Sequence, residues 1–202
     1  MRKHRKEFNS ILAIFKPQFA DMKPAVFLDR DGTLIAEKNY LCQPGEVVIF
    51  PGVPAALKRL GDAGFGLFIV SNQSGVGRGY FTLADVERVN EHLRGELAAA
   101  GVRLEKFYIA PEAPGQPSSG RKPSPQFLFD ARDEFDVDLA RSYMIGDKRI
   151  DLECGWNAGV QKSILVRTGY GAELERTEAD RLARAVVVND LPGAADWILK
   201  NL

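Results

Sequence analysis

The segment AVFLDRDGTL, residues 25–34, decides the fold of this chain. Its first half, Ala25–Leu28, is a continuous apolar run of the kind that forms a strand buried in a parallel sheet. Its second half is polar and places two carboxylates, Asp29 and Asp31, directly after that strand. Ligands of parallel α/β sheets bind beyond the carboxyl ends of the strands. The segment therefore predicts both a buried strand and part of a polar site.

The rest of the chain alternates short apolar runs with amphipathic stretches, which is typical of an α/β fold with a parallel sheet covered by helices on both faces. One helix is expected to begin after Thr82, whose hydroxyl can cap it, and to end before Gly101. The expected strands are Ala25–Leu28, Leu67–Val70, Lys106–Ile109, Tyr143–Ile145, Ser163–Val166 and Ala185–Val188. The expected helices are Pro51–Ala63, Thr82–Ala100, Ser124–Phe135, Ile150–Ala158 and Pro192–Leu199.

The composition limits the class of protein. The chain has 202 residues, and its 27 Lys and Arg balance its 27 Asp and Glu, so the formal net charge is zero. This balance argues against a general binder of nucleic acid or membrane surfaces, because such proteins need a basic excess. The two cysteines, Cys42 and Cys154, cannot form a disulfide framework, so reduced thiols in the cytoplasm are expected.

The chain is expected to form one domain with a short extension. The apolar stretch nearest the N-terminus, Ile11–Phe15, is far shorter than the roughly 20 residues of a membrane span. Residues 1–23 are predicted to be an N-terminal extension, and residues 24–202 the domain. The expected protein is a monomer with no membrane or nucleic-acid partner.

Polar groups follow the expected strands at three places, and a fourth group precedes a helix that leads back to the sheet, so all four are expected to gather at one end of the sheet. Four carboxylates that converge would repel each other unless Mg²⁺, which prefers oxygen ligands, lies among them. A lysine, a hydroxyl and the backbone N–H groups around Gly32 add positive potential, and this set suits phosphoryl transfer. Each group alone is as easily structural, since Asp and Gly are common in turns. The groups are Asp29 with Asp31, Ser71-Asn72-Gln73-Ser74, Arg121-Lys122, and Asp147 with Asp151.

A glycine-rich stretch, Gly75–Gly79, imitates a phosphate-binding loop. It lacks the third glycine of the dinucleotide fingerprint, because Tyr80 stands there, and the chain has no Walker lysine motif. We expect a flexible turn, with Arg78 as a candidate substrate contact.

The strings DRDGTL, SNQSGVGRGY, RKP and GDKRID resemble the haloacid dehalogenase superfamily of aspartyl-phosphate phosphatases, from about Ala25 to Val166. They are most similar to the branch that holds the heptose bisphosphate and histidinol-phosphate phosphatases. The string SNQSGVGRGY and Lys148 favour the heptose enzymes. The resemblance implies a Rossmann-like parallel sheet, a small phosphorylated sugar as substrate, and a place in lipopolysaccharide core precursor synthesis.

The resemblance also implies the roles of the residues that carry the chemistry. Asp29 would be the nucleophile, and Asp31 would protonate the leaving oxygen and then activate water. Mg²⁺ would be held by the Asp29 carboxylate, the Asp31 backbone carbonyl and Asp147, with Asp151 acting indirectly.

The same resemblance implies how the substrate is held. Ser71 and Lys122 would bind the transferring phosphoryl group, and Arg121 and Lys148 a second phosphate. The sugar pocket would be lined by Glu37, Lys38, Asn39 and Tyr40, and flanked by Asn72, Gln73 and Ser74.

The chain departs from this family in one loop, which often carries zinc ligands spaced C-x-H and C-x-C. No thiol or imidazole stands at those positions here, so no zinc is expected. The intervals after Leu34 and after Ser71 are too short for a cap domain, so an open, capless site is expected. The four residues at the ligand positions are Ala110, Glu112, Ser118 and Gly120.

Three alternatives stay open beside a heptose bisphosphate phosphatase. One is a phosphatase for histidinol phosphate or another small phosphomonoester. A second is a non-catalytic phosphosugar-binding module, although such a protein would usually have lost Asp29 or Asp31. A third is a phosphatase of nucleic-acid ends, against which the neutral charge balance argues.

Overall fold

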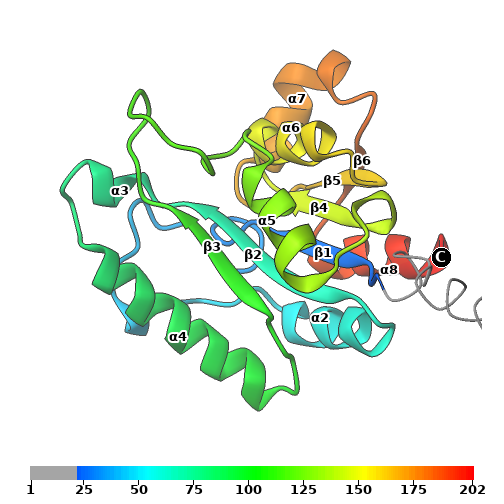
Figure 1. Ribbon diagram of the computed structural model, residues 1–202, viewed down its shortest axis with the longest axis horizontal. Coiled ribbons are helices and arrows are strands. Elements are labelled where there is room, and N and C mark those ends of the chain that lie inside the picture. Colours follow the sequence, from blue (N-terminus) through cyan, green and yellow to red (C-terminus); the bar gives the residue numbers. More distant parts are fainter. Residues whose placement is uncertain (1–21) are drawn as a thin grey trace, which may run out of the picture.

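Six strands, all parallel, form one sheet in the computed structural model, which describes residues 22–202 (Figure 1). Their order is β3-β2-β1-β4-β5-β6, so β1 lies between β2 and β4 in the middle of the sheet. The strands are β1 Ala25–Leu28, β2 Gly66–Asn72, β3 Lys106–Ala110, β4 Tyr143–Gly146, β5 Lys162–Val166 and β6 Val186–Val188. The predicted fold class, a Rossmann-like parallel sheet with helices on both faces, is confirmed.

Helices connect the strands and cover the sheet, with α5 in front of it and α8 behind it in Figure 1. The helices are α2 Val53–Asp62, α3 Ser74–Gly77, α4 Leu83–Ala99, α5 Gln126–Phe135, α6 Arg149–Ala158, α7 Gly171–Glu178 and α8 Leu191–Lys200. Single 3-10 turns occur at Pro44–Glu46, Leu139–Arg141 and Ala179–Arg181.

Apolar side chains of β1 alternate between the two helical layers. Val26 and Leu28 belong to the core cluster with α2, α4 and α8, whereas Ala25 and Phe27 belong to the cluster with α5 and α6. All four are fully buried. Because burial of a large apolar side chain stabilises a fold by ~1.5–3 kcal/mol, β1 is firmly fixed in the sheet. The position of Asp29, which directly follows β1, is therefore fixed as well.

One prediction of local structure was wrong, and one helix was not predicted. The stretch Gly75–Gly79 is not simply a flexible turn, because Ser74–Gly77 forms the short helix α3. Gly75 is buried there, and a Cβ on it would lie 2.2 Å from the Phe81 ring. The glycine therefore permits a close approach of backbone and ring. Helix α7 was not expected, because most of its side chains face solvent and leave no apolar period to detect.

The chain is part of the fold from its first described residues. The Lys23 N–H donates to the Asp136 carbonyl at 3.0 Å, and the Asp138 N–H donates to the Lys23 carbonyl at 2.9 Å. Most of the predicted extension, residues 1–21, lies outside the described residues.

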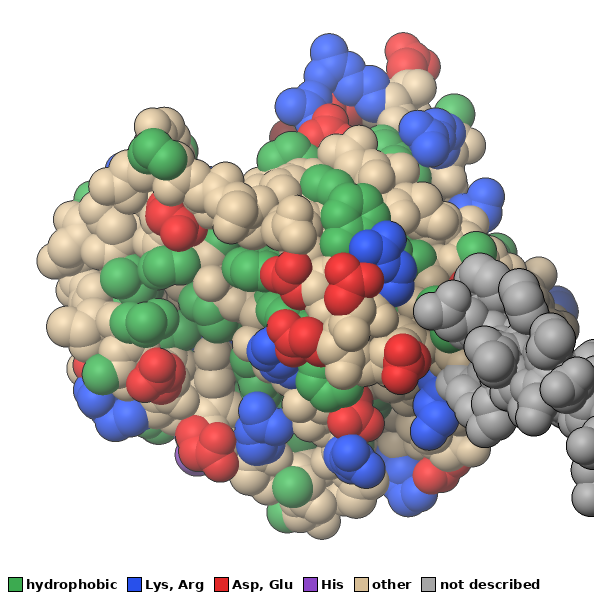
Figure 2. All heavy atoms as spheres, in the orientation of Figure 1, with side chains coloured by type: hydrophobic (Ala, Val, Ile, Leu, Met, Phe, Trp, Pro, Cys, Tyr) green, Lys and Arg blue, Asp and Glu red, His purple; other side chains and the backbone are tan. Residues whose placement is uncertain are grey.

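The space-filling view shows an indentation between the loop that follows β3 and helix α7 (Figure 2). Acidic and basic side chains are interspersed over the face in view (Figure 2). Within residues 22–202, no helix combines the length and the apolar composition that a membrane span requires.

Thr82 caps α4 reciprocally with Asp85. The Thr82 Oγ1 accepts from the Asp85 N–H at 3.2 Å, and the Asp85 Oδ2 accepts from the Thr82 N–H at 2.7 Å. We expect Thr82→Ala to lower the free energy of unfolding by ~1 kcal/mol, because an N-cap hydroxyl is lost. Thermal unfolding should detect this as a fall in Tm, while Thr82→Ser should unfold like the wild type. Equal stability of all three proteins would contradict the cap's contribution.

Candidate active site

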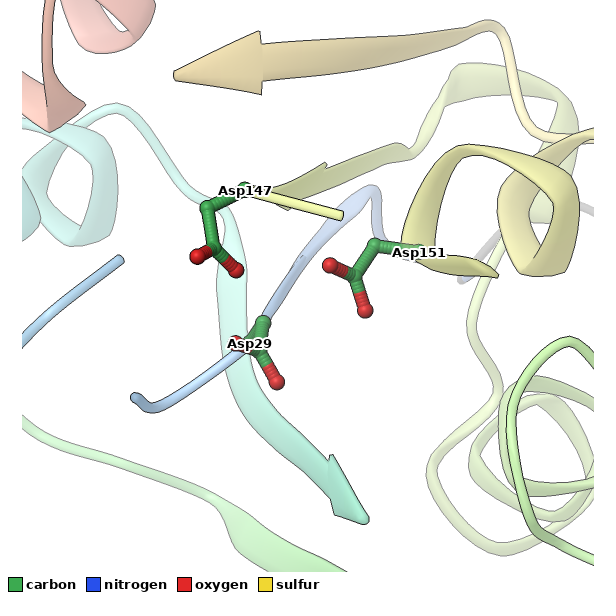
Figure 3. A group of neighbouring side chains, drawn as sticks. All are labelled: Asp29, Asp147 and Asp151. Atoms are coloured by element: carbon green, nitrogen blue, oxygen red, sulfur yellow. The ribbon is translucent and has the colours of Figure 1, made fainter. Parts of the chain in front are cut away.

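Three buried carboxylates converge at the carboxyl edge of the sheet (Figure 3). Asp29 follows β1, Asp147 follows β4, and Asp151 belongs to the first turn of α6. One oxygen from each lies within 4.8 Å of the others. Since β1 and β4 are parallel neighbours, their carboxyl ends lie side by side. The topology of the sheet therefore builds this cluster from residues more than a hundred positions apart.

Burial dominates the electrostatics of the cluster. It raises the pKa of Asp29 to about 8 and that of Asp147 to about 6, against opposing effects of Lys122 and Lys148 respectively. Burial alone would lower the pKa of the Lys122 ammonium, but Asp151 and Asp29 outweigh it and raise that pKa. A charged lysine therefore lies among acids that resist ionisation.

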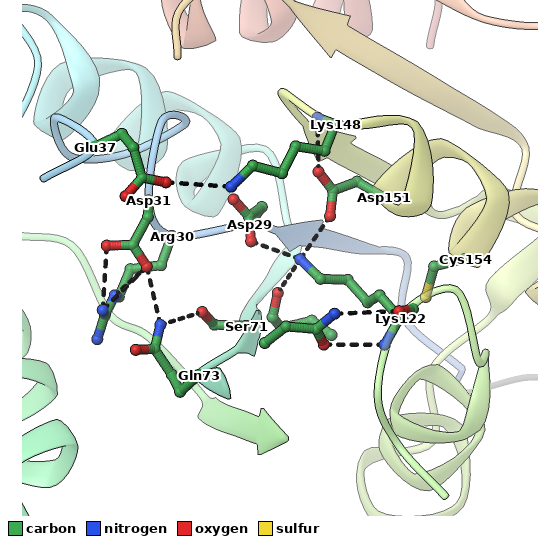
Figure 4. A network of polar contacts seen from close by, with 12 residues as sticks. Asp29, Arg30, Asp31, Glu37, Ser71, Gln73, Lys122, Lys148, Asp151 and Cys154 are labelled. Atoms are coloured by element: carbon green, nitrogen blue, oxygen red, sulfur yellow. Dashed lines mark hydrogen bonds and ion pairs between the residues drawn. The ribbon is translucent and has the colours of Figure 1, made fainter. Parts of the chain in front are cut away.

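Lys122 links the acids to the sheet (Figure 4). Its Nζ lies 2.5 Å from Asp29 Oδ1 and 2.6 Å from Asp151 Oδ1, and it donates to the Val70 carbonyl at 2.7 Å. The side chain is 1% exposed. The Asn72 amide pairs with both the N–H and the carbonyl of Lys122, at 3.0 and 3.1 Å. Asn72 thus anchors the lysine's backbone as well as lining the cavity.

Asp147 has one oxygen that is free to hold a cation. Its Oδ2 accepts from the Tyr170 N–H at 2.9 Å, whereas its buried Oδ1 has no hydrogen-bond partner among residues 22–202. A Cβ on Gly32 or Gly169 would lie 2.3 or 2.1 Å from Oδ2, so only glycine fits at these two contacts. A buried, unpartnered carboxylate oxygen beside two further carboxylates fits Mg²⁺, which prefers oxygen ligands.

The Asp31 carboxylate lies apart from this cluster (Figure 4). Its Oδ2 accepts from Arg30 Nε at 3.0 Å and from Gln73 Nε2 at 2.9 Å, and its Oδ1 accepts from Arg30 Nη2 at 3.1 Å. The same Gln73 amide donates to Ser71 Oγ at 2.8 Å. Gln73 therefore joins the predicted acid/base to the predicted phosphate-binding hydroxyl. The Asp31 carbonyl as a metal ligand stays a prediction.

A cavity of about 270 Å³ opens beside these groups. Asp29, Asp31, Asp151, Ser71 and Lys122 lie along its wall, and Asp147 is not part of its lining. Other predicted residues on the wall are Glu37, Asn39, Tyr40, Asn72, Gln73, Ser74, Arg121 and Lys148. Lys38 and Arg78, also predicted from the sequence, are exposed and do not line this cavity.

Several lining residues were not predicted from the sequence. The most informative is Tyr170, whose ring lies 4.8 Å from Lys148 Nζ, while the same ammonium pairs with Glu37 at 3.1 Å. Tyr170 follows β5, so the rule that strand ends build the site could have found it. The residues missed are Arg30, Leu41, Gly75, Phe81, Ile150 and Tyr170.

The loop after β3 is held by hydrogen bonds among its own residues. Ser118 Oγ donates to Glu112 Oε2 at 2.7 Å and accepts from the Arg121 N–H at 3.2 Å. The Arg121 guanidinium donates to the Glu112 carbonyl at 2.9 Å. Two residues at the expected positions of absent zinc ligands, Glu112 and Ser118, therefore contact each other and hold Arg121 at the cavity.

Comparisons with known proteins agree with this geometry. A family model described as HAD-hydrolase-like matches residues 119–194. The chain is 37% identical over 193 residues to the D-glycero-D-manno-heptose-1,7-bisphosphate 7-phosphatase of Thermosynechococcus vestitus, covering 89% of this chain and 97% of that protein. It is 36% identical over 186 residues to the Escherichia coli D-glycero-beta-D-manno-heptose-1,7-bisphosphate 7-phosphatase, covering 89% and 90%. The crystal structure of D,D-heptose 1,7-bisphosphate phosphatase from B. bronchiseptica, complexed with magnesium and phosphate, superposes with a TM-score of 0.79 at 29% identity, covering 89% and 99%.

The raised pKa values predict how magnesium binding depends on pH. With pKa values of about 8 for Asp29 and about 6 for Asp147, the folded metal-free protein keeps protons that the unfolded chain has released, so its stability falls as pH rises through this window. Mg²⁺ competes with those protons. We therefore expect Mg²⁺ to raise Tm more at about pH 8 than at about pH 6.

The matched variants are Asp147→Asn and Glu153→Gln. The first removes a carboxylate of the cluster and should abolish most of the magnesium-dependent rise in Tm. The second alters a carboxylate of α6 that pairs with Arg149 at 3.3 Å and belongs to no part of the cluster, so the rise should persist. A rise in Tm of the same size at both pH values would contradict the competition between protons and metal.

Proposed function

Because the chain belongs to the haloacid dehalogenase superfamily of phosphatases, with heptose bisphosphate phosphatases as its relatives, we propose that it removes the C7 phosphate of D-glycero-D-manno-heptose 1,7-bisphosphate. The observation that carries this proposal is the buried group of Asp29, Asp147 and Asp151 around Lys122, beside a cavity that Arg121 and Lys148 also line. We place the reaction in the cytoplasm, in the synthesis of lipopolysaccharide core precursors.

Phosphoryl transfer would proceed in two steps at Asp29. In the first, an Asp29 oxygen attacks phosphorus, the bond from phosphorus to the C7 oxygen breaks, and Asp31 gives its proton to that oxygen. In the second, water attacks the aspartyl-phosphate, the bond from phosphorus to the Asp29 oxygen breaks, and Asp31 takes the proton from the water. Heptose 1-phosphate and inorganic phosphate are released, and both aspartates return to their starting states.

The residues around Asp29 would neutralise the charge of the phosphoryl group. Mg²⁺, held by Asp29 and Asp147 with Asp151 beside them, would supply charge stabilisation when bound. Lys122 and Ser71 would hold the phosphoryl oxygens. Lys122 remains charged because its acidic neighbours raise its pKa, so it is prepared for an anion before the substrate arrives.

The second phosphate would be recognised within the same cavity. Arg121 and Lys148 both line it, and each is held in place, Arg121 by the Glu112 carbonyl and Lys148 by Glu37. Histidinol phosphate carries one phosphate and would leave both of these cations without a phosphate to bind. The bisphosphate therefore accounts for the cavity better than the monophosphate does.

The remaining alternatives receive less support. A non-catalytic sugar-binding module does not need both Asp29 and Asp31. A phosphatase of nucleic-acid ends needs a basic surface, whereas acidic and basic side chains are interspersed on the face seen in Figure 2 and the chain's net charge is zero.

The first test is phosphate release from the heptose 1,7-bisphosphate, histidinol phosphate and fructose 1,6-bisphosphate, with and without Mg²⁺. We expect magnesium-dependent turnover that favours the heptose, and loss of nearly all turnover in Asp29→Asn, because the amide cannot form the acyl phosphate. Full turnover by Asp29→Asn would overturn the nucleophile assignment. Weak turnover of all three substrates would reject the heptose while leaving the phosphatase in place.

The second test concerns the remote phosphate. Arg121→Ala and Lys148→Met should each lower kcat/KM for the bisphosphate by about tenfold or more, since a hydrogen bond to a charged group contributes about 1.5–3 kcal/mol. Their kcat/KM for a small monophosphate should change far less. Arg149→Ala is the matched control, because this neighbouring cation pairs with Glu178 at 3.0 Å and does not line the cavity. Equal losses on both substrates would contradict a role in binding the second phosphate.

A further inference from the structure

Arg30 is the largest fully buried side chain among the described residues and has no role in the two steps above. Its guanidinium is 1% exposed. Nε and Nη2 donate to the two oxygens of Asp31 at 3.0 and 3.1 Å, and Nη1 donates to Asn90 Oδ1 at 2.8 Å (Figure 4 shows the contact with Asp31). A buried cation is tolerated only where it is paired and hydrogen-bonded. Arg30 meets this condition through Asp31 and Asn90.

The backbone of Arg30 and its side-chain partner Asn90 are both held in place. The Arg30 carbonyl accepts from the N–H groups of Leu34 and Ile35 at 2.9 and 3.2 Å. Asn90 is buried on α4, the helix whose start is capped by Thr82. The contacts therefore run from α4 through Asn90 and Arg30 to Asp31.

The two donors of Asp31 differ in what else they contact. Gln73 shares one amide nitrogen between Asp31 and Ser71, so a phosphoryl group at Ser71 would compete for it. Arg30 directs its donors to Asp31 and Asn90 instead. The planar fork of a guanidinium also fixes the plane of a carboxylate, which a single donor does not do. Arg30 can thus hold Asp31 whether or not substrate is bound.

We propose that Arg30 is the positioning residue that orients Asp31, and that Asn90 positions Arg30 in turn. This inference rests on the proposed function, in which Asp31 is the general acid and base. Proton transfer requires the acid to lie within hydrogen-bond reach of the leaving oxygen. If the fork is lost, Asp31 can turn away from that oxygen, and the protonation of the leaving group suffers first.

The leaving group makes this role measurable. A sugar oxygen leaves as a strong base and needs the proton from Asp31, whereas nitrophenolate is a weak base and leaves without it. The parameter kcat/KM reports the steps up to release of the alcohol, so hydrolysis of the aspartyl-phosphate does not enter it. A loss of acid positioning therefore lowers kcat/KM for a sugar phosphate and spares nitrophenyl phosphate.

The experiment compares kcat/KM of the full chain with Mg²⁺ on these two substrates. Asp31→Asn shows the result expected when the general acid is removed. Its kcat/KM for the sugar phosphate should fall by about 10²–10⁴-fold, the usual contribution of general acid catalysis. We expect Asn90→Ala to lower kcat/KM for the sugar phosphate by about tenfold, and Arg30→Lys to lower it further. For nitrophenyl phosphate, kcat/KM of both variants should change by about twofold or less. In the Asp31→Asn background, Asn90→Ala should not lower kcat/KM further, because Asn90 acts through Asp31.

Val89→Ala is the matched control. Val89 is buried on α4 beside Asn90 and packs in the core, so its truncation should lower Tm without changing the ratio of the two activities. If Arg30→Lys does not fold, Asn90→Ala still tests the proposal, because it leaves the guanidinium in place. A Tm measurement for each variant separates lost stability from lost positioning.

The outcomes separate the two proposals. Equal losses on both substrates in Asn90→Ala, or no loss on either, would overturn the positioning role while leaving the phosphatase intact. Failure of the wild type on the heptose bisphosphate would reject the proposed substrate, and the ratio would then be measured on the sugar phosphate that it does hydrolyse. A wild type that hydrolyses no phosphomonoester would overturn both.

Discussion

The site depends on one interaction, the burial of the Lys122 ammonium among Asp29, Asp151 and the Val70 carbonyl. Three carboxylates gathered away from water would repel each other, and burial raises the pKa of Asp29 and Asp147 there. A lysine at 1% exposure offsets part of that repulsion. In the proposed mechanism the same charge neutralises the phosphoryl group, so the lysine that stabilises the acidic cluster would also prepare it for an anion. The lysine that stabilises the acidic cluster is therefore the one that we propose binds the phosphoryl group.

The parallel sheet supplies the rigid frame for this interaction. β1 and β4 deliver Asp29 and Asp147 side by side, β2 delivers Ser71 and the Val70 carbonyl, and β5 leads to Tyr170, whose N–H holds Asp147. Two glycines, Gly32 and Gly169, allow the loops after β1 and β5 to approach Asp147 more closely than any side chain would permit. Because Asp29 and Asp147 directly follow buried strands, the sheet fixes where their backbones lie.

The residues that we propose to recognise the second phosphate lie, by contrast, in loops around the cavity. Arg121 is held by a loop whose Glu112 and Ser118 bond to each other, and Lys148 is held by Glu37 from the segment after β1. These are partly exposed contacts, which contribute less than the buried ones at the sheet edge. A substrate specificity that depends on them can change between relatives while the buried aspartates and lysine keep the same chemistry.

The sequence by itself determined the strands and the residues that follow them. Ala25–Leu28 is apolar throughout, so it had to be buried on both faces, and Asp29 and Asp31 had to lie at its carboxyl end. It also placed Ser71, Lys122, Asp147 and Asp151 next to other elements. It could not show that Asp31 turns away from the acidic cluster toward Arg30, or that α4 reaches this pair through Asn90. Those contacts depend on where a helix packs against the sheet, and side-chain partners so distant in the chain leave no period or spacing to read. Only the tertiary structure decides them.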